Sequence, residues 1–149
     1  MMSRKTLLGT AIAATAITLA GCGQMRPSQK VDIHQARLTG AEEVPPVNTA
    51  ANGMAEIQLN TNTNVLSWKV TYTGLSGTAT GGHIHGPAAP GRNAGVVIPF
   101  TNVAAQPLTG QTTITPQQYG DLAAGRWYVN IHTAANPGGE IRGQLRKRQ

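Results

Sequence analysis

Three histidines in two short segments are the residues of this chain best suited to chemistry. His83 and His85 lie two positions apart in residues 81–86 (GGHIHG), and His132 lies in residues 128–133 (YVNIHT). Side chains two positions apart in a strand leave the same face, roughly 6.6 Å apart along the backbone. Imidazole nitrogens bind transition metals at about 2.0–2.1 Å, so two such rings can lean onto one ion.

The alternation of apolar residues indicates that these histidines point away from the core. Ile84 is the large apolar residue of its segment and is out of phase with His83 and His85. In the later segment the apolar and polar residues also alternate, with Trp127, Val129 and Ile131 on one side and Tyr128, Asn130 and His132 on the other. We expect the three imidazoles to meet outside the core if the two strands end side by side.

Three neutral imidazoles suit copper or zinc, and we place copper first because it ranks above zinc in affinity for nitrogen sites. His34 is a candidate for a fourth nitrogen ligand. Its position beside a polar segment favours a solvated residue at a domain edge instead. The alternative for the whole set is three solvated surface histidines without a metal.

Glu140 and Asn130 are candidates for supporting the ligands. Glu140 and Arg142 flank Ile141 on an expected strand, after a turn at residues 136–139. A carboxylate there can accept the free N–H of a ligating histidine. The alternative is an exposed ion pair with Arg142, worth about 0–1 kcal/mol. The six acidic residues form no paired carboxylate site, and no catalytic triad or phosphate-binding loop is present in the sequence.

The first 21 residues have the features of an export signal. Arg4 and Lys5 precede an apolar run at residues 7–20, which is too short to suit a membrane-spanning helix. The run ends in residues 19–22 (LAGC), which resemble the cleavage box of bacterial lipoproteins. The resemblance implies that Cys22 is lipidated and becomes the first mature residue. The alternative is an ordinary secretory signal followed by a cysteine without a role.

The expected organisation is therefore a lipoprotein signal peptide at 1–21, a flexible tether at 22–32 and one domain at 33–149. Cys22 is the only cysteine, so the domain has no disulfide. We expect attachment to a lipid bilayer through acylated Cys22, in the cell envelope, with another envelope protein as a further partner. Glycine rather than aspartate after Cys22 implies, in a Gram-negative cell, the outer membrane, facing the periplasm or the cell surface.

The charge of the chain indicates little about its function. Removal of Arg4 and Lys5 would lower the formal charge of +6 by two, and much of the remainder is in the C-terminal tail. Only 4% of the residues are aromatic. A nucleic-acid surface needs basic residues interleaved with aromatic ones, so we expect no nucleic-acid partner.

Short alternating segments separated by glycine, proline and asparagine predict an all-β domain. The expected strands are residues 33–39, 54–59, 65–73, 80–85, 96–100, 110–114, 126–132 and 140–145. One short helix is expected at residues 117–124, because Thr115 and Pro116 form a start signal and Gly125 suits a stop. The pattern predicts an antiparallel Greek-key sandwich or barrel, of the immunoglobulin-like or copper–zinc superoxide dismutase-like kind.

Four segments in order resemble the CHRD domain, which is named for its repeats in chordin. They are residues 38–47 (LTGAEEVPPV), 82–87 (GHIHGP), 128–133 (YVNIHT) and 136–145 (NPGGEIRGQL). The resemblance covers about residues 35–145 and implies an extracellular β-domain. In chordin these domains belong to a protein that binds growth factors, and in bacteria they occur in exported proteins, so the resemblance implies location more than activity.

His83 and His85 also resemble the His-x-His strand of copper–zinc superoxide dismutases. The chain departs from that family because it has no zinc loop, no disulfide and no active-site arginine in context, and it would need His34 as a further copper ligand. We therefore expect binding, storage or transfer of an ion in the envelope rather than catalysis. Two alternatives remain: a non-catalytic module that binds protein or polysaccharide, and a dismutase-like redox enzyme.

Overall fold

The computed structural model describes residues 30–149, so the expectations for the signal peptide, for Cys22 and for nearly all of the tether lie outside the described residues. The elements are β1 (Val31–Thr39), the 3-10 turn η1 (Gly40–Glu42), β2 (Asn52–Asn60), β3 (Val65–Thr73), β4 (Ala79–His85), β5 (Val96–Pro99), β6 (Leu108–Thr113), α1 (Pro116–Ala123), β7 (Tyr128–Thr133), β8 (Ile141–Gln144) and β9 (Arg146–Lys147). Between residues 30 and 149 no helix is long and apolar enough to span a bilayer.

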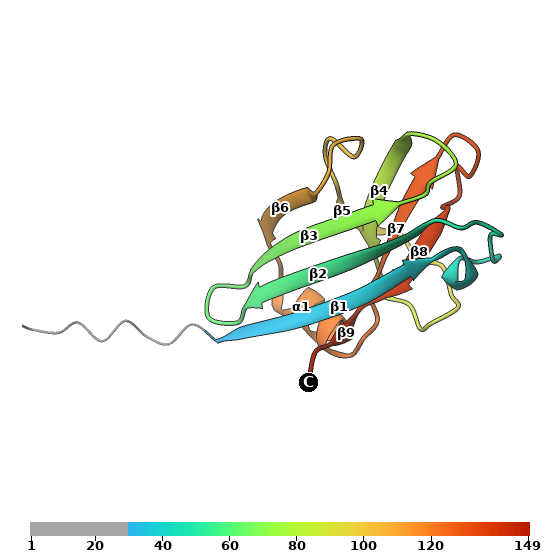
Figure 1. Cartoon of the computed structure of the whole chain (residues 1–149). Coiled ribbons are helices and arrows are strands. Elements are labelled where there is room, and N and C mark those ends of the chain that lie inside the picture. The colour runs from blue at the N-terminus through green and yellow to red at the C-terminus, as the bar shows by residue number, and fades with distance from the viewer. Residues whose placement is uncertain (1–29) are drawn as a thin grey trace, which may run out of the picture.

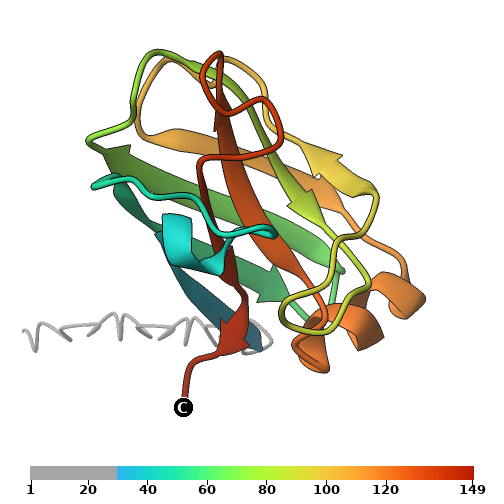
Figure 2. The same cartoon turned by 90° about the vertical axis from the view of Figure 1, so that its right-hand side faces the viewer.

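The described strands form one curled antiparallel sheet in the order β5-β4-β7-β8-β1-β2-β3-β6, and β9 pairs with β1 (Figures 1 and 2). Trp68 on β3 stacks on Phe100, directly after β5, with ring centroids 5.5 Å apart. This contact brings the two ends of the sheet toward each other around the core. The prediction of an all-β sandwich or barrel with one short helix is confirmed.

Hydrophobic alternation explains which residues fill this curled sheet. Ala55, Ile57 and Leu59 of β2 are fully buried, as their spacing predicts, and β2 and β3 form the expected hairpin. Ile84 of β4 and the apolar residues of β7 belong to the same core. A strand with period-2 alternation must turn its other side chains out of that core, so the polar residues of β4 and β7 share the opposite face.

Helix α1 begins and ends where local chemistry predicts. The Thr115 side chain accepts a hydrogen bond from the backbone N–H of Gln118, whose side chain accepts one from the backbone N–H of Thr115. This reciprocal capping box satisfies two N–H groups at the helix start. Gly125 follows the helix with φ of +68°, a conformation that glycine adopts without steric cost.

The expectation that His34 is a solvated residue at a domain edge is wrong. His34 lies on the inner side of β1 with Ala36 and Leu38 and is 0% exposed. Strand β9, which the sequence analysis did not predict, pairs with β1 at this point and places Lys147 opposite His34. Both ring nitrogens lack a hydrogen-bond partner. Burial lowers the pKa of His34 and keeps the ring neutral.

The alternative of an exposed Glu140–Arg142 ion pair is wrong, because both side chains are buried and bind other groups. Glu140 accepts hydrogen bonds from the hydroxyls of Thr49, Ser76 and Thr133 and from the backbone N–H of Ser76. Burial raises the pKa of Glu140, but these hydrogen bonds outweigh it and lower the pKa to about 2. The carboxylate therefore joins the segment before β2, the segment after β3 and the end of β7.

We predict that Glu140→Gln destabilises the domain by about 2 kcal/mol at pH 7, because a charged acceptor is lost from several buried donors. The folded-state pKa of Glu140 lies below its ordinary value of 4.5. The stabilisation of the folded domain by the ionised Glu140 carboxylate is therefore present above pH 4.5 and is lost as the pH falls toward about 2. Urea unfolding across this pH range measures the difference, which should shrink toward zero in acid. The exposed Glu42→Gln serves as the control, and an equal effect of both variants would contradict the prediction.

Candidate metal centre

The register between β4 and β7 brings the histidine segments together. Across the two strands, Gly81 lies opposite His132, His83 opposite Asn130, and His85 opposite Tyr128. Directly opposed residues project from the same face of an antiparallel sheet. The three histidines therefore share the polar face, and one nitrogen from each lies within 4.8 Å of the other two. The expected convergence of the imidazoles is present.

The distance between His83 and His132 fits metal coordination. His83 Nδ1 and His132 Nε2 are 3.0 Å apart. Two nitrogens bound to one ion at 2.0–2.1 Å lie about 2.9–3.4 Å apart for bond angles between square-planar and tetrahedral values. The His85 ring centroid is 5.3 Å from that of His83, and one nitrogen of His85 lies within 4.8 Å of a nitrogen of each other ring, so His85 is the third candidate ligand.

Backbone carbonyls determine which nitrogen of two rings is free to bind. His85 Nδ1 lies 2.9 Å from the carbonyl of Ala94, and His132 Nδ1 lies 2.9 Å from the carbonyl of Pro137. Because a carbonyl can only accept, each Nδ1 carries the proton and donates, and each Nε2 of the neutral ring keeps its lone pair. His85 Nε2 is buried without a hydrogen-bond partner, so its lone pair is free to bind a metal ion.

Electrostatics keep two of the rings neutral. Burial lowers the pKa of His83, and the neighbouring His132 and His85 lower it further. Burial also lowers the pKa of His132, against a raising effect of the Pro137 carbonyl. Metal ions bind neutral imidazole, so lowered pKa values reduce competition from protons.

Arg142 holds residues 86–95, here called the covering loop, against the polar face through hydrogen bonds. The guanidinium carbon of Arg142 lies 3.4 Å from the centroid of the Tyr128 ring, which stacks on His85 at 4.9 Å. Arg142 also donates hydrogen bonds to the Asn93 side chain and to the Arg92 carbonyl, both in the covering loop. Because the same loop supplies the carbonyl that orients His85, Arg142 holds that ring indirectly. From its position in the sequence, Arg142 was predicted only as an ion-pair partner of Glu140.

The structure brings together some of the predicted supporting residues and not others. Asn130 is 4% exposed, and its Oδ1 lies 3.0 Å from His132 Nε2. Glu140 hydrogen-bonds hydroxyls and a backbone N–H rather than an imidazole, and backbone carbonyls fill the role expected of it. His34 lies on β1 and is not a member of the three-histidine group. Every residue has a backbone carbonyl, so the sequence could not indicate that those of Ala94 and Pro137 accept hydrogen bonds from His85 and His132.

The sequence analysis also missed Glu43, which follows η1 and is 5% exposed. Its Oε1 has no hydrogen-bond partner, and burial raises its pKa to about 7, against a lowering effect of Arg142. The available signal was an acidic residue next to the Val44–Pro45–Pro46 segment, where a constrained backbone can hold a side chain inward.

The family model of the CHRD domain matches residues 34–145. The match runs from β1 to the residue after β8 and includes all three histidines of the cluster. No solved structure matches the chain.

We predict that, in the metal-free protein at pH 7.5, His85 and His132 are protonated at Nδ1 and unprotonated at Nε2. Long-range ¹H–¹⁵N correlation spectra of the imidazole rings measure this directly. A titration from pH 8 to 5 should give midpoints below the ordinary value of 6.5 for His83 and His132. Protons on Nε2 of both rings would contradict the hydrogen-bond assignment, and the spectrum of His34→Leu identifies the signals of the buried fourth ring.

Proposed function

The chain belongs to the CHRD domain family, and from this premise we propose that it binds a transition-metal ion, copper before zinc, in the cell envelope. The ligands are His83, His85 and His132. The observation that carries the proposal is the convergence of three imidazoles, two of which have their Nδ1 atoms engaged by carbonyls and their Nε2 atoms left as lone pairs. We propose that the protein binds the ion in order to store it or to transfer it to another molecule in the envelope.

The chemistry of the cluster supports copper over zinc. Its ligands are imidazole nitrogens, without a thiolate or a carboxylate in the group. Nitrogen sites bind Cu²⁺ more tightly than Zn²⁺ in the usual order of affinities. His83 and His132 are half-buried, so an ion at this place remains within reach of a donor or acceptor molecule from solvent.

We propose further that Cys22 is acylated and anchors the domain to a bilayer. The eight residues between Cys22 and β1 can span at most roughly 30 Å, which keeps the domain near the lipid. The C-terminal strand β9 pairs with the beginning of β1, so the exposed Arg146 and Arg148 lie near the end of the domain that the tether enters, whereas Lys147 is paired with Asp32 at 2.8 Å (Figure 1). Basic residues at that end suit an anionic surface.

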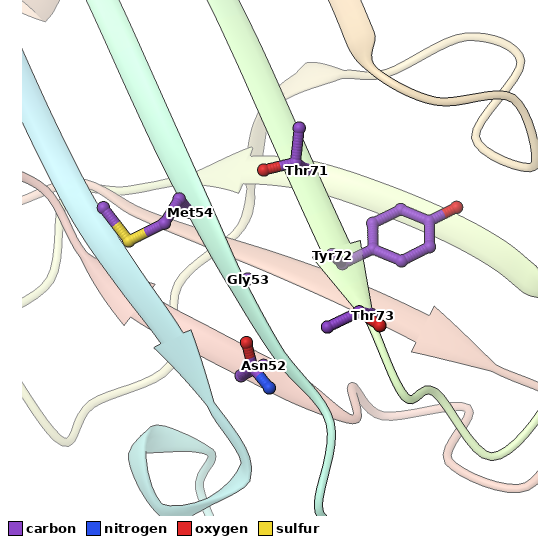
Figure 3. A pocket seen from close by; sticks show the side chains of 6 residues that line it. All are labelled: Asn52, Gly53, Met54, Thr71, Tyr72 and Thr73. Carbon is purple, nitrogen blue, oxygen red and sulfur yellow. The ribbon is translucent and has the colours of Figure 1, made fainter.

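An adhesive module is the second candidate, supported by the outer face of β2 and β3. A shallow hollow of about 250 Å³ there is lined by Asn52, Gly53, Met54, Thr71, Tyr72 and Thr73 (Figure 3). Its amide and hydroxyl groups suit hydrogen bonds to a polysaccharide. This role needs none of the histidines, so a variant of His83 would retain it.

We predict that His83→Ala weakens Cu²⁺ binding by at least roughly 100-fold, because one of three ligands is lost from a site whose bonds are near 2 Å. Isothermal titration of the purified full chain against a competing chelator measures the affinity. His34→Leu, which removes a histidine outside the cluster, should bind like the wild type. Equal affinities of the wild type and His83→Ala would remove the proposed ligand, and a loss in His34→Leu would place His34 in the site.

We predict that Cys22→Ser moves the protein from the membrane fraction to the soluble fraction and abolishes labelling with a radioactive fatty acid. The physical reason is that acyl chains supply the binding energy of the anchor, about 0.8 kcal/mol for each buried CH₂ group. Gly23→Ala is the control and should remain with the membrane. Membrane retention of Cys22→Ser, without label in either protein, would contradict acylation.

A further inference from the structure

Asn130 is a buried polar residue at the cluster for which the proposed function gives no direct role. Its Oδ1 lies 3.0 Å from His132 Nε2, and Asn130 lies directly opposite His83 across β4 and β7. The residue is only 4% exposed, so water cannot freely replace this contact. Asn130 therefore lies beside two of the three imidazoles.

The contact between Asn130 and His132 places two lone-pair atoms against each other. The Nδ1–H of His132 is donated to the Pro137 carbonyl, so Nε2 of the neutral ring is an acceptor. The amide oxygen is an acceptor as well. His83 Nδ1, 3.0 Å from the same Nε2, can donate a proton to it, but the amide oxygen has no donor in this contact. A cation shared by Nε2 and Oδ1 turns the repulsion between these two acceptors into attraction.

The spacing of these atoms matches the edges of a coordination polyhedron. His132 Nε2 lies 3.0 Å from His83 Nδ1 and 3.0 Å from Asn130 Oδ1. Ligand atoms bound at 2.0–2.1 Å are separated by about 2.9–3.4 Å. Both separations therefore fit two ligand atoms on one ion, the first for His83 with His132 and the second for His132 with Asn130.

Glu43 lies at the other end of the same amide. A Cβ built on Gly139 would lie 2.3 Å from Glu43 Oε1 and 2.9 Å from Asn130 Nδ2, so both atoms occupy the space on that side of the glycine. Glu43 Oε1 has no hydrogen-bond partner. No hydrogen bond joins the two atoms, so the carboxyl oxygen acts on the amide through charge alone, which favours the N–H end on the side of Gly139 and the oxygen on the side of the imidazoles.

We propose that Asn130 is the fourth ligand of the ion held by His83, His85 and His132, bound through Oδ1, and that Glu43 orients its amide. This inference rests on the proposed function. A neutral oxygen is a harder ligand than nitrogen or sulfur, so the completed set favours a divalent ion over Cu⁺. It is also a weak ligand, which an incoming donor displaces when the ion is transferred.

The test compares Cu²⁺-loaded full chains by chelator competition and by electron paramagnetic resonance. Asn130→Leu, which keeps the volume and removes the oxygen, should weaken Cu²⁺ binding at least tenfold and change g∥. Asn130→Asp should strengthen binding at least tenfold and lower g∥, because a carboxylate makes the coordination sphere more negative. Asn52→Leu, on the exposed side of β2, is the control and should leave both readouts unchanged.

The role of Glu43 is tested by a conservative and a non-conservative change. Glu43→Gln retains an oxygen beside Asn130 and should bind Cu²⁺ like the wild type. Glu43→Leu removes that oxygen and should weaken binding several-fold with the g∥ change seen in Asn130→Leu. Equal binding and equal spectra for Glu43→Leu and the wild type would overturn this role.

The outcomes separate this inference from the proposed function. If the wild type binds Cu²⁺ and both Asn130→Leu and Asn130→Asp have the same affinity and g∥ as the wild type, Asn130 is not a ligand. The proposed histidine site is then unaffected. A wild type that binds no Cu²⁺ overturns both. If Asn130→Leu fails to fold, Asn130→Asp decides the question, because an unchanged g∥ in that variant excludes coordination at position 130.

Discussion

The antiparallel pairing of β4 with β7 is the constraint on which the candidate site depends. Its register directs Ile84, Val129 and Ile131 into the core. Because side chains alternate along a strand, this burial also determines that His83 and His132 share the opposite face. A slip of one residue would move the histidines into the core and the apolar residues out of it. Hydrophobic burial therefore positions the candidate ligands, although none of them belongs to the hydrophobic core.

The polar face is enclosed by charges rather than by apolar packing. Arg142 lies on Tyr128 and fastens the covering loop, Glu140 joins three segments near the end of β7, and Glu43 lies beside Asn130 at Gly139. Buried charges of this kind are stable only when geometry supplies partners for them. Glu140 has several donors, whereas Glu43 Oε1 has none. That difference makes Glu140 a structural residue, whereas Glu43 contributes a buried carboxyl oxygen without a donor.

The histidine cluster resembles sites in which neutral ligands are oriented by backbone groups. The carbonyls of Ala94 and Pro137 select the tautomers of two rings, and both carbonyls belong to loops. A loop that orients a ligand from its far side contributes to affinity without touching the ion. An ion bound at this cluster would therefore be coupled to the conformation of these two loops, and membership of the CHRD domain family does not by itself indicate that coupling.

Much of the architecture was determined by local patterns in the sequence. Alternation predicted the hairpin of β2 and β3 and the inward direction of Ile84, and the Thr115 and Gly125 signals predicted helix α1, because these features depend on neighbours along the chain. The meeting of the three histidines was predictable as a hypothesis from the same alternation. Only the tertiary structure decided the burial of His34 on the inner side of β1, the partners of Glu140 and the contacts of Arg142 and Glu43. Those contacts join residues far apart in the chain, and no periodicity within a single segment carries information about them.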